Sequence, residues 1–428
     1  MIGVVLFVLL ILFIVCKIPI AVGMGLSGVV YFIYAGIPFG TFVQQALSGA
    51  DSFVLMAIPL FMFSGELMND GGLTPRMIRL ADAFVGHFRG GLGMATVIVC
   101  MIFAGTCGSA VAEAAAIGAL LIPAMVKQGY PKDLAAAVTG AGSELGPIIP
   151  PSVPMIITAS ISKVPVGKLF MGGMIPGILI GLSFIAVTAV IASREKIPIF
   201  PKSNLKERLL SVKEGVWAIL APAIIIGGML GGLFTPTEAG AAATAYGFFV
   251  GFVVYRELKF SSLPRICYKV LISTATVMYV VALAKVYTFA LTRERVPEAV
   301  ANFLLGLSSS PFLIMLIILV FVLILGMFLS TTPALVLSIP LFVPFVSKLN
   351  VDPVWFYTFV TIALCMGTLT PPVALTLYLT SQMADTPPER TFVRMVPYLT
   401  CMVVILILSF LYQPIITWVP GLMHSPSP

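Results

Sequence analysis

Two stretches rich in glycine, proline, serine and threonine interrupt an otherwise apolar chain, and they are copies of one another. The matched positions, each 221 residues apart, are Gly105 and Gly326, Ser109 and Ser330, Pro123 and Pro344, Gly146 and Gly367, and the proline pairs 150–151 and 371–372. A constant separation through two motifs indicates an internal repeat. Helix-breaking residues at corresponding positions of two apolar halves are typical of the binding site of a membrane transporter.

Broken helices leave backbone groups free to bind ions. Helix N-termini attract anionic groups, whereas freed carbonyls together with Ser and Thr hydroxyls suit a dehydrated Na⁺. The residues predicted to bind Na⁺ are Gly105, Thr106, Gly108, Ser109, Ser143, Gly146, Gly326, Ser330, Gly367, Thr368 and Thr370. Those predicted to contact a substrate are Ser109, Pro150, Pro151, Ser152, Thr331, Thr332, Pro371 and Pro372. The plainer alternative is that small residues permit close helix packing.

Four ionisable residues, Glu113, Glu144, Glu238 and Lys285, lie in or beside apolar segments, where a charge is costly without a partner or water. Proton coupling through Glu113 or Glu144 is one interpretation. A structural or helix-end role is the other, and it is favoured because the matching positions of the second copy carry no acid.

Composition identifies a membrane protein. Of 428 residues, 59% are hydrophobic and only 10% are charged, whereas soluble domains carry about 25% charged residues. Apolar runs of this length predict helices rather than barrel strands. The six cysteines have no metal-site spacing, the two histidines (His87 and His424) cannot build a metal cluster or a triad, and no phosphate-binding loop or protease motif is present. We therefore expect a non-enzyme without a cofactor.

The expected elements follow the same order in both halves. The first half predicts helices 2–16 and 19–36, a loop, helix 51–69, an amphipathic arm 73–88, a hairpin 91–126, a broken helix 132–160 and helix 170–192. The second predicts helices 216–232, 237–255 and 270–291, an arm 296–306, a hairpin 311–348, a broken helix 353–383 and helix 396–418. The polar stretch 193–215 is predicted to be an amphipathic linker. Helix 2–16 is expected to be retained, since its first positive charge, Lys17, follows it.

Parity predicts the topology. If each hairpin enters the membrane and returns, about five crossings remain in each half, and an odd number inverts the second repeat relative to the first. With the linker in the cytoplasm, 18 Lys and Arg residues fall on that side and five on the other, with Lys285 within a span. This bias agrees with the positive-inside rule and explains the net charge of +7 better than nucleic-acid binding does. Both termini are then expected in the periplasm.

Several long motifs resemble one known family. They are residues 89–92 (RGGL), 105–118 (GTCGSAVAEAAAIG), 122–130 (IPAMVKQGY), 146–152 (GPIIPPS), 234–240 (FTPTEAG) and 367–372 (GTLTPP). They are similar to the large membrane subunit of tripartite ATP-independent periplasmic (TRAP) transporters, within the wider ion-transporter superfamily, over nearly the whole chain.

The resemblance implies an all-α polytopic protein that imports an organic anion with Na⁺ across a bacterial inner membrane. It also implies two partners, a periplasmic substrate-binding protein and a small four-helix membrane subunit, the latter expected as a separate chain. The implied mechanism is an elevator, in which a transport domain slides against a scaffold. The expected transport domain comprises 51–160 and 270–383, and the expected scaffold comprises 1–50, 161–192, 216–255 and 396–418, with 193–215 as the cytoplasmic linker.

Substrate and coupling are less constrained. Many family members carry an acid where this chain has Ser330 and a glycine where it has Ala374. No arginine lies clearly within a span, so a bulky monocarboxylate such as sialic acid is slightly preferred over C4-dicarboxylates, other sugar acids and keto acids. The alternatives are a Na⁺- or H⁺-coupled carrier of the same superfamily that needs no binding protein and, from a different class, a channel or a lipid-linked enzyme.

Overall fold

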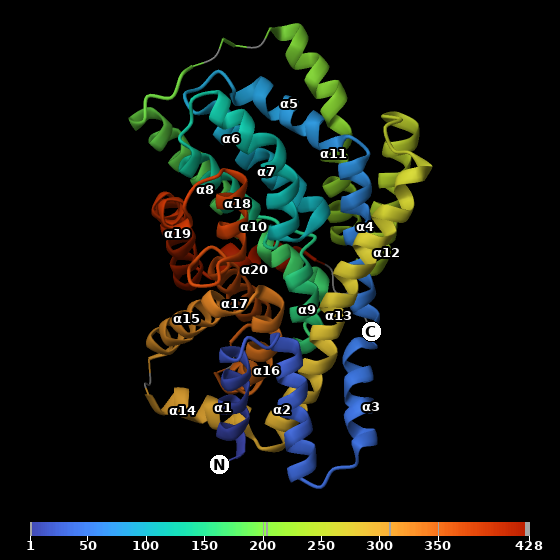
Figure 1. Ribbon diagram of the computed structural model, residues 1–428, viewed down its shortest axis with the longest axis vertical. Helices are drawn as coiled ribbons and strands as arrows, with labels where there is room; N and C mark the ends of the chain where they lie inside the picture. The colour runs from blue at the N-terminus through green and yellow to red at the C-terminus, as the bar shows by residue number, and fades with distance from the viewer. Residues whose placement is uncertain (1, 200, 203, 308–309, 350, 424–428) are drawn as a thin grey trace.

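The structure, a computed structural model, describes residues 2–199, 201–202, 204–307, 310–349 and 351–423 (Figure 1). Its description excludes the side chains of residues 2, 4, 106, 107, 311 and 349. Within the described residues every regular element is a helix, which confirms the predicted all-α class.

The helices of the first half are α1 (Ile2–Val15), α2 (Ile20–Tyr34), α3 (Phe39–Ala50), a 3₁₀ turn (Phe53–Met56), α4 (Ala57–Asp70), α5 (Leu73–Val85), α6 (Gly91–Cys107), α7 (Ala110–Lys127), α8 (Lys132–Ser143), α9 (Val153–Ser162) and α10 (Val166–Arg194). Those of the second half are α11 (Leu205–Leu230), α12 (Pro236–Phe249), a π-helical turn (Val250–Val254), a 3₁₀ turn (Phe260–Ser262), α13 (Leu263–Arg293), α14 (Val296–Leu307), α15 (Pro311–Phe328), α16 (Thr331–Leu349), α17 (Pro353–Gly367), α18 (Leu375–Met383), α19 (Pro388–Leu411) and α20 (Pro414–Leu422).

The described part of the chain contains eight helices long and apolar enough to cross a membrane, so the chain is a multi-pass membrane protein. Two of them, α7 and α16, belong to the predicted hairpins, whereas α1 and α2 are shorter. Length alone therefore does not separate re-entrant helices from crossings, and five crossings in each half stays a prediction.

Three local predictions were wrong. The expected loop before residue 51 contains α3, which packs along α13. The predicted helix 216–232 begins earlier, at Leu205, within the expected linker. The Asn204 backbone N–H donates to the Glu207 carboxylate at 2.9 Å, and this capping contact stabilises the helix start there. The expected helix 396–418 is divided into α19 and α20, and Pro414 occupies the first position of α20, where a missing N–H is tolerated.

Two helices form the buried centre of the molecule. All residues of α8 from Leu134 to Ser143 and of α17 from Trp355 to Gly367 are buried. Helix α8 packs against α6 and α7, and α17 packs against α15 and α16. The halves also interlock, since α9 packs against α16 and α18 packs against α7. Helices that are apolar on every face need such complete coverage.

Ion pairs join segments that the charge count places on one side of the membrane. Arg394 of α19 lies 3.2 Å from Asp133 at the start of α8 and 2.6 Å from Glu195 after α10. Lys132 lies 2.9 Å from Asp385 in the α18–α19 turn and holds the pKa of that carboxyl below its ordinary value. These ion pairs thus bring together the start of α8, the end of α10 and the start of α19, and the side of the membrane on which they lie stays a prediction.

The second helix break contains a strained residue. Ala374 precedes α18 with φ +35° and ψ 57°, in the left-handed region, and its side chain is buried. This conformation costs a non-glycine residue roughly 1–2 kcal/mol. A glycine at this position would relieve that strain.

We expect Ala374→Gly to raise the free energy of unfolding by about 1 kcal/mol, since relief of strain exceeds the added chain entropy. The thermal unfolding midpoint of the detergent-solubilised protein measures the change. The matched variant Ala363→Gly, inside α17, should instead lose about 1 kcal/mol or more. A loss of stability in both variants would contradict strain at Ala374.

Candidate functional site

The first hairpin turns at Gly108 and Ser109, between α6 and α7. Gly108 has φ +65°, and a Cβ atom there would lie 2.7 Å from the Pro151 carbonyl oxygen. Only glycine combines this backbone conformation with so close an approach. The hairpin tip therefore rests directly on the helix break between α8 and α9.

The second hairpin contacts its own broken helix through a pair of glycines, Gly326 and Gly367. A Cβ atom on Gly326 of α15 would lie 3.0 Å from the Cα atom of Gly367 at the end of α17. The Val373 backbone N–H also donates to the Met327 carbonyl at 3.1 Å. Gly105, the repeat counterpart of Gly326, instead faces Pro222 of α11. The repeat thus conserves the residue type but changes its contact.

A cavity of about 150 Å³ lies between the two hairpin tips and the two breaks. Six predicted site residues line it, namely Gly108, Ser109, Ser330, Thr331, Thr332 and Thr368. Pro147 and Thr376 also line this cavity, which we call the tip cavity. The structure therefore brings serine and threonine residues from both halves around one space.

Other predicted residues lie outside this lining. Ser143 donates its hydroxyl to the Gly140 carbonyl at 2.9 Å, and Thr370 donates to the Met366 carbonyl at 3.2 Å. The Ser152 hydroxyl donates to the Pro147 carbonyl and accepts from the Met155 N–H at 3.2 Å, so it closes the first break. The side chain of Thr106 lies outside the described part of the chain.

The two proline pairs, both joined by cis bonds, differ in their surroundings. Pro150 and Pro151 are buried, whereas Pro371 is half-buried and Pro372 is exposed. Neither pair belongs to the lining of the tip cavity. The first break is therefore sealed inside the protein, and the second lies nearer its surface.

Glu144 connects the two breaks. This fully buried residue follows α8, and its Oε1 atom accepts hydrogen bonds from the Thr368 hydroxyl and, at 2.9 Å, from the Thr376 hydroxyl. Glu144, which has no acidic counterpart at the matching position of the second half, is thus hydrogen-bonded to two residues of that half. Thr376 was missed by sequence reasoning because its repeat counterpart, Met155, is apolar.

Glu113 is the second buried acid. It lies in the first turn of α7, fully buried, with its carboxylate against Gly146 of the first break. Neither of its oxygens accepts from an N–H or O–H donor among the described residues, and its polar neighbour is the thiol of Cys100, a weak donor. A carboxyl group so placed must be neutral or held by a cation.

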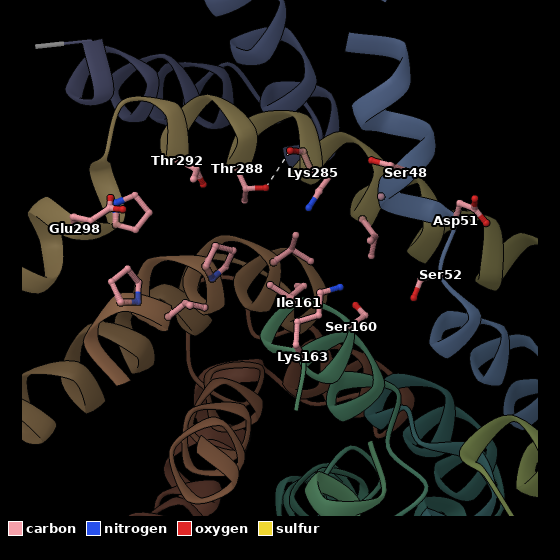
Figure 2. Close-up of a pocket in the computed structure, with 17 residues that line it drawn as sticks. Ser48, Asp51, Ser52, Ser160, Ile161, Lys163, Lys285, Thr288, Thr292 and Glu298 are labelled. Carbon is pink, nitrogen blue, oxygen red and sulfur yellow. Dashed lines mark hydrogen bonds between the residues drawn. The ribbon is translucent and has the colours of Figure 1, made fainter. Parts of the chain in front are cut away.

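The remaining two ionisable residues lie elsewhere. Glu238 accepts a hydrogen bond from the Thr235 N–H at 2.7 Å and so caps α12, which is the predicted helix-end role. Lys285 lines a second, larger cavity of about 420 Å³ between α13, the end of α9 and the middle of α16 (Figure 2).

Known proteins resemble this chain in sequence and in fold. The family model "Tripartite ATP-independent periplasmic transporter, DctM component" matches residues 7–415. A C4-dicarboxylate TRAP transporter large permease protein of Pseudomonas aeruginosa is 36% identical over 87% of this chain and 86% of that protein. A sialic acid TRAP transporter large permease protein of Vibrio cholerae is 35% identical over 90% of each chain.

Two further similarities differ in extent. An isethionate TRAP transporter permease protein, DctMQ, of Oleidesulfovibrio alaskensis is 37% identical over 96% of this chain but only 64% of that protein. A crystal structure of the YdaH transporter of Alcanivorax borkumensis has a TM-score of 0.63 over 88% of this chain and 89% of that one, at 15% identity. This last similarity concerns the fold.

Removing the bond between the two breaks should weaken the folded protein. We expect Thr376→Val to lower the free energy of unfolding by about 1–2 kcal/mol, because it removes a donor to a buried carboxyl group without changing shape. Thermal unfolding in detergent measures the loss, and Thr376→Ser, which keeps the hydroxyl, should lose less. Equal losses in the two variants would show that the bond to Glu144 is unimportant.

Proposed function

Because the chain belongs to the DctM component family of tripartite ATP-independent periplasmic transporters, we propose that it imports an organic anion together with Na⁺. The observation that carries this proposal is the tip cavity, where Ser109, Ser330, Thr331, Thr332 and Thr368 from both halves surround one space. Hydroxyl groups both donate to carboxylates and accept from cations, so one site suits both solutes.

Helix ends add favourable charge at this cavity. Helices α7 and α16 begin at Ala110 and Thr331, both in the cavity lining. Their N-termini carry partial positive charge and free N–H groups, which suit the carboxylate of a substrate. The C-terminal ends of α8 and α17 lie at the two breaks, where free carbonyl groups suit Na⁺.

The two buried acids support cation coupling. Among the described residues, Glu113 accepts from no N–H or O–H donor and has only the Cys100 thiol beside it, and the Oε2 atom of Glu144 has no hydrogen bond. A cation bound beside them would relieve the cost of burying charge. Sodium is preferred because carbonyl and hydroxyl oxygens gather at the breaks, and a proton on either acid is the competing proposal.

The substrate class follows from relatives and lining together. The proteins of similar sequence are named for C4-dicarboxylate, sialic acid, isethionate and 2,3-diketo-L-gulonate, all of which are acids. No arginine lines the tip cavity among the described residues. A monocarboxylate such as sialic acid is therefore preferred slightly over a dianion, which would call for a stronger cationic partner.

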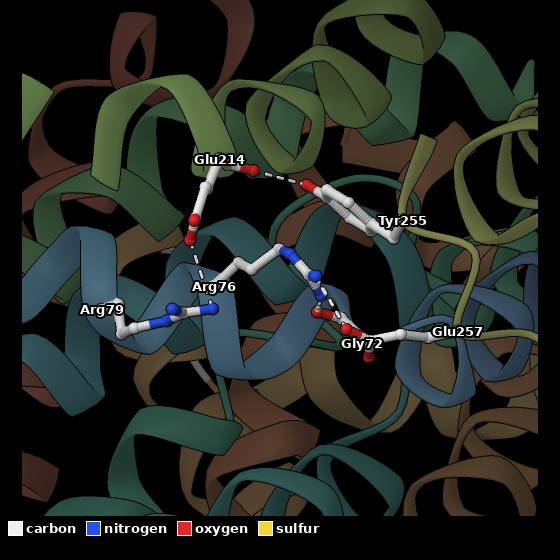
Figure 3. A network of polar contacts seen from close by, with 6 residues as sticks. All are labelled: Gly72, Arg76, Arg79, Glu214, Tyr255 and Glu257. Atoms are coloured by element: carbon white, nitrogen blue, oxygen red, sulfur yellow. Dashed lines mark hydrogen bonds and ion pairs between the residues drawn. The ribbon is translucent and has the colours of Figure 1, made fainter. Parts of the chain in front are cut away.

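The proposed movement is that of an elevator, with the hairpins and broken helices as the sliding part. Helix α5, which precedes the first hairpin, packs both against α6 of that hairpin and against α11 of the proposed scaffold (Figure 3). Arg79 lies 3.2 Å from Glu214 of α11, and Arg76 lies 2.7 Å from Glu257 and packs over the Tyr255 ring at 3.9 Å. We therefore propose that α5 is a fixed arm rather than part of the sliding domain.

The proposed assembly is a bacterial inner-membrane complex with a periplasmic binding protein and a small four-helix subunit. In this proposal both chain termini lie in the periplasm, as the positive-inside rule predicts from the distribution of Lys and Arg residues. The competing proposal is a carrier that needs no binding protein. The two proposals differ in whether this chain with its small subunit transports substrate on its own.

Uptake in reconstituted vesicles tests coupling and partners together. With binding protein and small subunit present, an inward Na⁺ gradient should drive uptake of radiolabelled sialic acid or succinate, and replacing Na⁺ by choline should abolish it. Omitting the binding protein should also reduce uptake to the level of empty vesicles.

Two results would overturn parts of this proposal. Uptake that survives in choline and follows a pH gradient would replace Na⁺ by protons. Uptake without a binding protein would favour the self-sufficient carrier.

Bulky residues at the hairpin tips should block transport. We expect Ser109→Leu and Ser330→Leu each to reduce uptake at least tenfold, an effect of about 1.4 kcal/mol or more, because the added side chain fills the tip cavity. Uptake is measured after matching the amount of inserted protein. Thr400→Leu on the exposed face of α19 is the matched control and should transport normally. Normal uptake by both serine variants would remove the tips from the transport site.

A further inference from the structure

The larger cavity, which we call the lysine cavity, lies between two groups of helices. One wall is formed by α3, α13 and α14, and the facing wall by the end of α9 and the middle of α16 (Figure 2). Its volume is about 420 Å³, larger than that of the tip cavity. No role in the proposed transport cycle has yet been assigned to it.

Two lysines from opposite walls expose their side chains here. Lys285 is on α13, and Lys163 follows α9 (Figure 2). All seven ion pairs of the described residues engage other lysines and arginines. Lys163 and Lys285 have no ion pair in the described part of the chain.

The other polar groups of the lysine cavity are hydroxyls and two acids. Ser52 and Ser160 lie near Lys163, and Thr288 lies one turn from Lys285 on α13 (Figure 2). Asp51 and Glu298 lie towards opposite ends of the cavity, with the lysines between them (Figure 2). The middle of the space is therefore positive and rich in hydroxyl donors, a setting that suits a carboxylate.

The same three helices line both cavities. Helix α9 lines the tip cavity at Val153 and the lysine cavity at Ser160, and α16 does so at Thr331 and at Pro340. Helix α13 does so at Val277 and at Lys285. Along a helix, eight residues span about 12 Å. The two cavities are thus successive positions along one bundle of helices.

We propose that the lysine cavity is an anion-binding antechamber, in which the carboxylate of the substrate binds between Lys163 and Lys285 before it reaches the tip cavity. The proposal rests on the proposed function for the direction of travel. It adds a second binding position and an electrostatic reason why anions enter: opposite charges raise the local concentration of the substrate in a cleft. The distribution of Lys and Arg residues predicts that Lys163 lies on the periplasmic side.

Charge-selective labelling tests the antechamber without requiring transport. Ser160→Cys on α9 and Ser48→Cys on α3 place thiols on facing walls of the cavity, in a chain whose exposed Cys16 and Cys267 are changed to serine. In membrane vesicles, the anionic reagent MTSES and the cationic reagent MTSET are compared by their labelling rates, read by mass spectrometry. We expect MTSES to be favoured, and Lys163→Gln with Lys285→Gln to lower the MTSES-to-MTSET ratio roughly tenfold.

Two controls separate this effect from a change in structure. Lys285→Arg keeps the charge and should keep the ratio. Lys348→Gln removes a lysine that contacts Asn302 outside the cavity lining and should leave the ratio unchanged. Millimolar sialic acid or succinate should slow MTSES labelling of the Ser160→Cys protein, and this protection should disappear in the double glutamine variant.

The outcomes are distinct from those of the transport assay. Faster labelling by MTSET in the presence of both lysines would show that Asp51 and Glu298 dominate, and it would overturn the antechamber. An unchanged ratio in the double variant would overturn it as well. A protein could show charge-selective labelling and substrate protection of the thiol but no Na⁺-driven uptake. That result would support the anion site and contradict only the proposed Na⁺ coupling.

Discussion

The fold depends on satisfying the backbone of two broken helices inside a membrane protein. Where α8 and α17 end, carbonyl and N–H groups lose their helical partners, and lipid offers no substitute. The protein meets this requirement with turn hydrogen bonds inside each break and with one bond from the Val373 N–H to the Met327 carbonyl. Close contacts of Gly108 with Pro151 and of Gly326 with Gly367 bring each hairpin against a break. The Ser152 hydroxyl completes the first break, because it donates to the Pro147 carbonyl and accepts from the Met155 N–H. Glu144 instead links the two halves through the hydroxyls of Thr368 and Thr376.

This requirement also explains why the two central helices are buried on all sides. A break that must not contact lipid needs neighbours around the helices that carry it, and the hairpins and the opposite half supply them. The cavity for solutes is what remains between the tips. The free helix ends that make the breaks costly in lipid are the same groups that can bind an anion and a cation.

Charged residues are divided according to whether they have partners. Ion pairs such as those of Arg76 and Arg394 tie helix ends together. Lys163 and Lys285 line a cavity, and neither lysine has an ion pair in the described residues. Glu113 is buried and has no N–H or O–H donor among the described residues. Charged groups without a partner are costly in a membrane protein unless water or a bound solute of opposite charge stabilises them. These residues are therefore the strongest candidates for binding ions and substrate.

The amino-acid sequence by itself determined the all-helical class, the repeat, both breaks and the residues that gather at the tips, because glycine, proline and hydrophobic run length act locally. It missed α3, which is shorter and less apolar than α2, and the division between α19 and α20 at Tyr412 and Gln413. Only the tertiary structure decided that Glu144 bonds across the repeat to Thr376, that Gly105 faces Pro222, and that Ser152 closes its own break. These contacts join residues far apart in the chain, and the choice among possible partners depends on how the helices pack, which no local pattern records.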